Sequence, residues 1–331
     1  MPDKRIRIRD VAERAGVSTG TISNVLNHPE SVSEPTREHI LRVMDELDFI
    51  RDASARHLRV GESQTVGVVV RDIANPFYME LARGVEDRLE REGCVMMLCS
   101  SDADAEREAR FVRLFAGQGV RGVLITPFQE EAEHSQRLQA LHIPVVLLDA
   151  ASQQAQSVSV DHLDGGRQAV RHLLDQGHRR IGFITGPNSL SPCRERAEGA
   201  RQAVAEAGLD PAEVLVTTQV DLLISSDSGQ HGMAALLERS AITAVFCVSD
   251  FLAMGALREL RTRGMAVPSD MAVVGYDDIF FAREMMVPLT SVRQPMHDLG
   301  WTAAEMLLHP DSHPQQVTFQ PQLVVRQSSL A

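Results

Sequence analysis

The fold of the amino-terminal region is decided by the stretch Ile8-Arg-Asp-Val-Ala-Glu-Arg-Ala-Gly-Val-Ser-Thr-Gly-Thr-Ile-Ser-Asn-Val-Leu-Asn27. Its first half carries apolar residues at intervals of three and four, the pattern of a helix with one buried face. That face consists of Ile8, Val11, Ala12 and Ala15. Gly16 can end this helix in the left-handed conformation, and Ser18 can cap a second helix. The buried face of the second helix consists of Ile22, Val25 and Leu26.

A third short helix follows, because Ser33 can cap it and Pro35 suits its first turn, where a missing N–H costs nothing. Its apolar stripe consists of Ile40, Val43, Met44 and Leu47. Two helices joined by a glycine-bearing turn, the second presenting small hydrogen-bonding side chains, are what a helix-turn-helix reader of DNA needs. On spacing alone, a generic three-helix interaction module remains the alternative.

The same stretch, followed by Val32-Ser-Glu-Pro-Thr-Arg37, resembles the headpiece of the lactose/galactose repressor (LacI/GalR) family. The resemblance implies that Thr19, Gly20 and Asn24 read bases. It implies contacts to DNA phosphates for a second set, which consists of Ser18, Thr21, Ser23, Asn27 and Thr36. Asn24 stands where the family frequently has arginine, and asparagine pairs with adenine whereas arginine favours guanine. We therefore expect an operator that differs from common family sites.

Residues 49–60 resemble the segment that forms the family's hinge helix when two subunits meet on DNA. The resemblance assigns Leu58 the role of an apolar wedge in the minor groove, where such a side chain unstacks a base step and bends the duplex. Ala55 would let the paired helices approach closely. A linker helix packed on its own domain is the alternative.

Length and composition restrict the class of protein. The chain has 331 residues, 44% of them hydrophobic, which suits two globular domains or two with an appendage. The net charge of −12 resides entirely beyond residue 60, because the first 60 residues hold ten basic and ten acidic groups. No apolar run approaches the roughly 20 residues of a membrane span. The four cysteines and the scattered histidines lack metal-ligand spacing, so we expect no metal and no cofactor. No apolar signal-peptide segment follows Met1, so we expect a cytoplasmic location.

Beyond residue 63 apolar strands alternate with amphipathic helices, which predicts parallel sheets covered on both faces. The expected strands lie near residues 65–70, 94–99, 121–126, 144–149, 180–185, 243–248 and 271–276. A dehydrogenase would show the same alternation. The sequence Gly117-Gln-Gly-Val-Arg-Gly122 matches the dinucleotide-binding fingerprint only formally, because a helix precedes it and a strand follows, the reverse of the required order. We therefore expect no catalytic residues and no enzyme.

Several core segments extend the family resemblance. They include Val69-Val-Arg-Asp-Ile-Ala-Asn-Pro-Phe-Tyr78, Gly177-His-Arg-Arg-Ile-Gly-Phe-Ile-Thr-Gly-Pro187 and Val273-Val-Gly-Tyr-Asp-Asp278. The resemblance implies an all-α helix-turn-helix headpiece joined to an α/β periplasmic-binding-protein-like core of two doubly wound parallel-sheet subdomains. We expect the headpiece at residues 1–50, the hinge at 51–63 and the effector-binding and dimerisation core at 64–331. The N-subdomain is expected at about 64–161 and 292–321, and the C-subdomain at about 162–291 and 322–331.

In such a core the ligand lies between the subdomains, at the carboxyl ends of the strands. By matching position, the resemblance assigns effector binding to Asp149, Arg194, Arg196, Ser249, Asp277 and Gln294, with Phe77 or Tyr78 as an aromatic platform. Phe77 and Tyr78 could instead be interface packing, and Arg194 a surface charge. Asp250 and Asp278 are interpreted as caps of the segments that follow them. Carboxylates, arginine and glutamine suit a polyol better than a flat purine, so a sugar or sugar derivative is the expected effector.

Together these features predict a homodimeric repressor of a carbohydrate-related operon that binds a near-palindromic double-stranded operator and contacts no membrane. Regulation of the same DNA-binding protein by a protein partner or a non-sugar metabolite is one alternative. A transport-type solute-binding protein that does not bind DNA is another.

Overall fold

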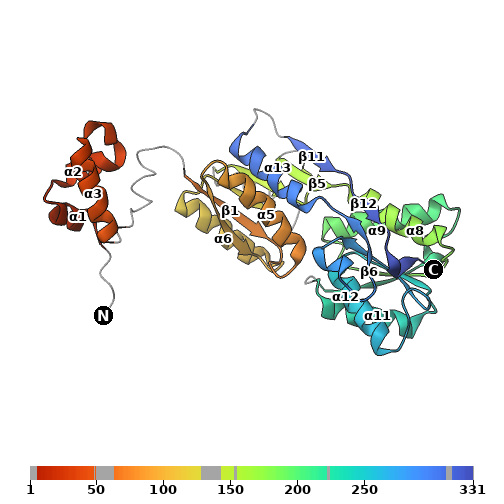
Figure 1. Cartoon of the computed structure of the whole chain (residues 1–331). Helices are drawn as coiled ribbons and strands as arrows, with labels where there is room; N and C mark the ends of the chain where they lie inside the picture. Colours follow the sequence, from red (N-terminus) through yellow and green to blue (C-terminus); the bar gives the residue numbers. More distant parts are fainter. Residues whose placement is uncertain are drawn as a thin grey trace. The chain divides into compact units, whose positions relative to one another are not determined.

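Contacts within the chain separate two compact units, residues 1–62 and residues 63–331. The structure is a computed structural model that describes residues 6–47, 49, 63–127, 143–152, 155–221, 224–310 and 315–330. The expected hinge roles of Ala55 and Leu58 fall outside these residues. Figure 1 shows the elements of both units.

The first unit is an all-α headpiece of α1 (Ile8–Ala15), α2 (Thr19–Asn27), η1 (Pro29–Ser31) and α3 (Glu34–Glu46). Its shared core consists of Val11, Ala12, Ala15, Ile22, Val25, Ile40, Val43 and Met44. Gly16 is left-handed at φ 67°, and its N–H bonds back to the end of α1, so the chain turns sharply into α2. The Ser18 hydroxyl caps α2 by accepting from Thr21 N at 3.0 Å. The expected helix-turn-helix is confirmed.

Two details of the headpiece differ from expectation. Ile8 is 37% exposed, and Ile6 packs on the core beside the first helix instead, because Ile8 is the first residue of α1 and lies at its open end. Ser33 stands at the start of α3, but its hydroxyl bonds Thr36 Oγ1 at 2.8 Å instead of a backbone N–H. Pro35 occupies the first turn as expected.

The second unit holds two six-stranded sheets within its described residues. The first sheet has the order β11-β5-β4-β3-β1-β2. Its strands are β1 (Thr65–Val70), β2 (Val95–Ser100), β3 (Gly122–Ile125), β4 (Val145–Leu148), β5 (Gln156–Val160) and β11 (Gln316–Phe319). With α5 (Pro76–Glu90), α6 (Ala105–Gln118) and α13 (Met296–Leu308) they form the N-subdomain. All neighbouring strands in this sheet are parallel.

The second sheet has the order β12-β10-β9-β8-β6-β7. Its strands are β6 (Ile181–Thr185), β7 (Leu215–Gln219), β8 (Ala244–Cys247), β9 (Ala272–Asp277), β10 (Thr290–Arg293) and β12 (Gln322–Val324). The helices of this C-subdomain are α8 (His162–Asp175), α9 (Ser191–Glu206), α10 (Pro211–Val214), α11 (Ser226–Arg239) and α12 (Asp250–Thr262), with short turns η2 (Phe280–Arg283) and η3 (Gln327–Ser329). Only β12 runs antiparallel to its neighbour, β10, among the strand pairs of the described residues. The expected two-sheet fold is confirmed.

Side chains along each strand point alternately to the two faces of the sheet, and helices cover both faces. In β1, Val66, Val68 and Val70 belong to the core under α5 and α13, whereas Val69 belongs to the core under α6. Gly67 also faces α6, and a side chain there would meet the Phe115 ring at 2.4 Å. Successive strand residues point to opposite faces, so an apolar run of this kind is covered on both sides.

The chain crosses between the subdomains three times, after β5, after β10 and after β11. The boundary expected between residues 291 and 292 lies inside β10, which remains in the second sheet to Arg293. Pairing with β9 up to Asp277 holds these last residues of β10, so the crossing follows them. Figure 1 shows the result: α13 lies beside α5 although the two helices are far apart in the sequence.

Two glycines allow α5 and α13 to touch through their backbones. A methyl group at Gly84 would lie 2.0 Å from the carbonyl oxygen of His297, and one at Gly300 would lie 1.9 Å from that of Leu81. We predict that Gly84→Ala lowers the free energy of unfolding by about 2 kcal/mol, because overpacking costs about 1–3 kcal/mol. Chemical denaturation of the full chain measures the change.

Gly117→Ala is the matched control. Gly117 lies within α6 with no atom within 4 Å of the added methyl group, so alanine should stabilise by about 0.5–1 kcal/mol. Equal effects of the two substitutions would contradict the backbone contact between α5 and α13.

Candidate functional site

Polar side chains from both sheets meet where the strands end. Asp149 follows β4 and Arg71 follows β1 in the first sheet. From the C-subdomain, Asp277 ends β9, His162 begins α8 and Arg196 lies in α9. Asp149 and Asp277 adopt positive φ angles of 53° and 109°, which ordinary side chains rarely adopt. Such backbone conformations cluster at binding sites.

Three buried side chains connect the two subdomains. His162 Nε2 lies 2.8 Å from Asp149 Oδ1, so the C-subdomain bonds the N-subdomain directly. Arg196 Nη2 lies 3.2 Å from His162 Nδ1, and Arg196 Nη1 donates to the Val248 carbonyl oxygen at 2.6 Å. The Arg196 guanidinium stacks 3.7 Å from the centre of the Tyr276 ring. We refer to Asp149, His162 and Arg196 as the linking triad.

The hydrogen bonds of the linking triad define the charge on His162. Burial and the nearby Arg196 guanidinium lower the pKa of His162, so the imidazole is neutral at pH 7. The neutral ring donates from Nε2 to Asp149 and accepts at Nδ1, the tautomer that these contacts require. Burial alone would raise the pKa of Asp149, but His162, Arg196 and Arg71 outweigh it and lower that pKa. Asp149 is therefore the ionised member of the pair.

Asp277 is held differently. Gln294 Nε2 donates to Asp277 Oδ1 at 2.6 Å, and Arg196 Nη1 lies 4.0 Å from that oxygen. Burial raises the pKa of Asp277 to about 7, since Arg196 and Gln294 offset only part of the cost of a buried charge. Burial and the neighbouring Asp277 also raise the pKa of Asp250 well above its usual range.

Two polar atoms at the same strand ends are buried without a hydrogen-bond partner among the described residues. They are Arg71 Nε and Gln294 Oε1. Arg71 Nη1 donates to the Tyr78 hydroxyl at 3.1 Å, and Nη2 approaches the Pro127 carbonyl oxygen at 3.4 Å. Buried polar atoms in native proteins are almost always satisfied, so an orphan donor and an orphan acceptor indicate a place for ligand groups.

The structure brings together Asp149, Arg196, Asp277 and Gln294 as expected, but it uses other expected residues differently. Arg194 is exposed and donates to the Asn188 carbonyl oxygen, because a position two residues from Arg196 faces another side of α9. The Ser249 hydroxyl caps α12 by accepting from Leu252 N. Arg194 and Ser249 as effector ligands therefore remain predictions.

The two aromatic residues pack as a pair. Phe77 and Tyr78 are buried in the first-sheet core with their rings edge to face, 4.9 Å between centroids. Only the Tyr78 hydroxyl has a described contact at the strand ends, with Arg71. The platform role of either ring remains a prediction.

The interpretation of Asp250 and Asp278 as helix caps is wrong. Asp250 lies inside α12 and accepts from Ile279 N at 2.9 Å and from the Ser291 hydroxyl at 2.7 Å. Asp278 pairs with Arg293 and Arg326. Ser249 precedes Asp250 and takes the capping position, so the expectation misses by one residue.

Sequence reasoning missed His162, Arg71 and Tyr276. Each lies at the carboxyl end of a strand or directly beyond it, which is the available signal. Lone histidines and tyrosines near strands occur more often as core residues, and only the pairing of Asp149 with His162 across the two subdomains distinguishes this case.

The headpiece presents a separate polar surface. Thr19, Gly20 and Asn24 are exposed on α2, as a base-reading ridge requires. Ser18 is also exposed, next to the amino-terminal end of α2, where free N–H groups favour phosphate. Other residues of the expected phosphate-contacting set are partly buried, namely Thr21, Ser23, Asn27 and Thr36, and Asn27 donates to the Ser23 carbonyl oxygen at 2.8 Å.

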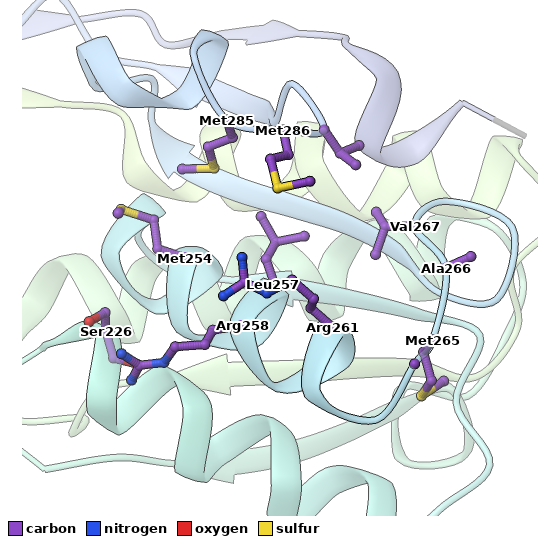
Figure 2. A pocket seen from close by; sticks show the side chains of 12 residues that line it. Ser226, Met254, Leu257, Arg258, Arg261, Met265, Ala266, Val267, Met285 and Met286 are labelled. Atoms are coloured by element: carbon purple, nitrogen blue, oxygen red, sulfur yellow. The ribbon is translucent and has the colours of Figure 1, made fainter.

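A groove of about 690 Å³ lies elsewhere on the C-subdomain, between α12 and the loops around residues 264–267 and 285–287. Figure 2 shows methionine side chains on its walls, including Met254, Met285 and Met286. The groove contains none of the linking triad, and although Arg258 Nε is a buried donor without a described partner, most of the lining side chains are apolar. The groove therefore suits a polyol less well than the strand ends do. Within the described ranges, no helix is long and apolar enough to cross a membrane, and no group of three metal-ligating side chains occurs.

Comparisons with known proteins cover both units. Residues 7–52 match the model of the bacterial regulatory proteins of the lacI family, and residues 170–329 match a periplasmic binding protein-like domain. The HTH-type transcriptional regulator DegA of Bacillus subtilis (strain 168) is 33% identical over 97% of this chain and 97% of its own length.

Two solved structures extend the likeness. The complex of the transcriptional regulator CelR with cellobiose is 33% identical and covers 98% of this chain and 100% of its own, with a TM-score of 0.72. The lac repressor dimer bound to operator and the anti-inducer ONPF is 29% identical and covers 99% and 100%, with a TM-score of 0.84. Headpiece and core are thus similar to the same class of protein.

The raised pKa of Asp277 predicts a pH dependence of stability. Between about pH 4 and pH 7 the folded Asp277 keeps a proton that the unfolded chain has released, so this residue lowers the free energy of unfolding as the pH rises. Asp277→Asn should remove this contribution, whose slope is at most about 1.4 kcal/mol per pH unit. Denaturant titrations of both proteins from pH 5 to pH 7.5 measure the difference. The exposed carboxylate Asp298, changed to Asn, provides the control, and identical slopes for wild type and Asp277→Asn would refute the assignment.

Proposed function

This chain belongs to the lacI family of bacterial regulatory proteins, and from that premise we propose that α2 reads an operator while the strand ends of the core bind a sugar-like effector. The protein is a DNA-binding transcriptional regulator and not an enzyme. The single observation that carries the effector assignment is the buried linking triad beside two orphan polar atoms.

The headpiece supports specific readout of duplex DNA. A left-handed turn at Gly16 and the Ser18 cap orient α2 so that Thr19, Gly20 and Asn24 face solvent, while Ile22 and Val25 pack inward. Asparagine can make two hydrogen bonds to adenine in the major groove. Gly20 offers no side chain, so Thr19 and Asn24 carry the direct readout from this helix.

The strand ends support a hydroxyl-rich effector. Asp149 provides a carboxylate acceptor, Gln294 an amide oxygen without a partner, and Arg71 and Arg196 guanidinium donors. Such fixed acceptors and donors orient a polyol. The CelR structure with cellobiose supports a sugar ligand in a related core. We infer control of a carbohydrate-related operon from this likeness.

The linking triad explains how an effector could change DNA binding. A ligand among these residues competes with or adds to the Asp149–His162 bond, which joins the subdomains. Any difference in its affinity for two arrangements of the subdomains shifts the population between them. Linkage then makes operator affinity depend on effector concentration, with either sign.

We infer that the functional unit is a homodimer in the cytoplasm, where operator DNA resides. Two-fold operators are bound by paired helix-turn-helix units, and the related lac repressor was solved as a dimer on its operator. The core offers exposed apolar surface for pairing, with Val95 and Met97 on the edge strand β2 and Met286 at the groove in Figure 2.

Asn24→Arg tests the operator assignment. Selection of bound duplexes from a random library with the full-length protein should yield a near-palindromic site. The variant should change the preference at one base pair of each half-site from adenine to guanine, by about 5- to 150-fold, since a bidentate contact discriminates by about 1–3 kcal/mol. Glu38→Ala, an exposed change on α3, should leave the preferred sequence unaltered. A library with no enriched sequence, or the same enriched sequence for Asn24→Arg, would contradict readout by α2.

A further inference from the structure

Arg71 is a buried cation without a carboxylate in direct contact among the described residues. It follows β1 and its guanidinium contacts two neutral oxygens, the Tyr78 hydroxyl and the Pro127 carbonyl. Its Nε is buried and has no hydrogen-bond partner among the described residues. Asp149 stabilises its charge electrostatically but forms no ion pair with it, so no described carboxylate contacts the guanidinium. Burying a charge without a partner is costly, so native proteins pair such groups or bind ions there.

Arg88 shows what the same subdomain does with a structural arginine. Its buried guanidinium pairs with Glu305 and with Glu92. The chain therefore supplies carboxylates where an arginine serves packing alone. Arg71 lacks them, although the fork of a guanidinium is suited to bind a carboxylate or phosphate through two parallel hydrogen bonds.

Arg71 belongs to the strand-end site. It interacts electrostatically with Asp149 and Arg196, and Tyr78 interacts with Asp149, Asp277 and Arg196. Asp149 is ionised, but the pKa of Asp277 is raised to about 7, so two guanidiniums face less than two full negative charges near neutral pH. The site thus has an excess of positive charge that a neutral sugar would leave uncompensated.

We propose that the effector carries an anionic group, a carboxylate or a phosphate on a hydroxyl-rich body, and that Arg71 and the Tyr78 hydroxyl bind this group. The inference rests on the proposed effector-binding function and specifies its ligand class. Burial raises the pKa of Tyr78, so the hydroxyl keeps its proton and can donate it to the anion while accepting from Arg71. Gln294 Oε1 and Asp149 remain to accept from hydroxyl groups of the ligand body.

The unliganded protein provides a first test that needs no effector. Arg71→Met removes a buried charge that has no direct ion-pair partner and should raise the melting temperature of the full-length protein. Arg88→Met is the matched control and should lower it, because it leaves Glu305 and Glu92 without their partner. If Arg71→Met destabilises as much as Arg88→Met does, Arg71 is a structural ion-pair residue and the inference is wrong.

Calorimetry of the full-length protein tests the ligand class with matched compounds. The probes are glucose, glucuronate and glucose 6-phosphate, the corresponding galactose series, and ribose with ribose 5-phosphate. We expect at least one anionic member to bind at least tenfold more tightly than its neutral parent. Arg71→Gln should abolish that preference, and Arg71→Lys should retain part of it. The carboxylate and phosphate members identify which anion the site takes.

The possible failures are distinguishable. A neutral parent that binds as tightly as its acids, or acid binding that Arg71→Gln leaves intact, overturns the anionic ligand while the sugar-effector function stands. If no compound of any series binds, the sugar-effector function itself is contradicted and the anionic ligand with it.

Discussion

The hydrogen bond between Asp149 and His162 is the constraint on which the core depends. It is buried, it joins the end of a first-sheet strand to the first helix of the other subdomain, and its geometry requires a neutral imidazole beside an ionised carboxylate. Arg196 fixes that state from the far side of the ring. A buried carboxylate is costly without such partners, so the arrangement of the two subdomains and the charge state of Asp149 depend on each other.

The topology lets this bond influence how the two subdomains are arranged. Three short crossings connect the subdomains, and each sheet has its own core, so neither subdomain needs the other to bury its apolar surface. Rigid bodies joined by a few crossings move as hinged units, and polar contacts at their boundary decide which arrangement prevails. An effector that binds at the strand ends acts on that boundary. The headpiece, a separate compact unit, contributes the DNA-reading surface.

Much of the fold could be predicted from the sequence, because helix periodicity and buried strands leave strong local signals. The headpiece and seven strands of the core follow from such patterns. The other five strands of the described residues were missed. β5 alternates serine with valine, β10 has only four residues with two hydroxyl side chains, and β7, β11 and β12 lie at sheet edges. The site was predicted only in part. Asp149 and Arg196 were assigned by matching their positions to the family that the sequence resembles, whereas the roles of His162 and Arg71 depend on partners distant in sequence. The one-residue error at Asp250 has the same origin, because the partners of its carboxylate, Ile279 and Ser291, are distant in sequence while Ser249 caps α12.

The most direct measurement is a double-mutant cycle on the free energy of unfolding of the full chain, with Asp149→Ala, His162→Ala and the double variant. If the bond couples the subdomains, the sum of the stability losses of the two single variants should exceed the stability loss of the double variant. The difference should be about 1–3 kcal/mol, the range for a buried hydrogen bond to a charged group. Losses that add within about 0.5 kcal/mol would show that the two residues act independently, and the linking triad would not hold the subdomains together.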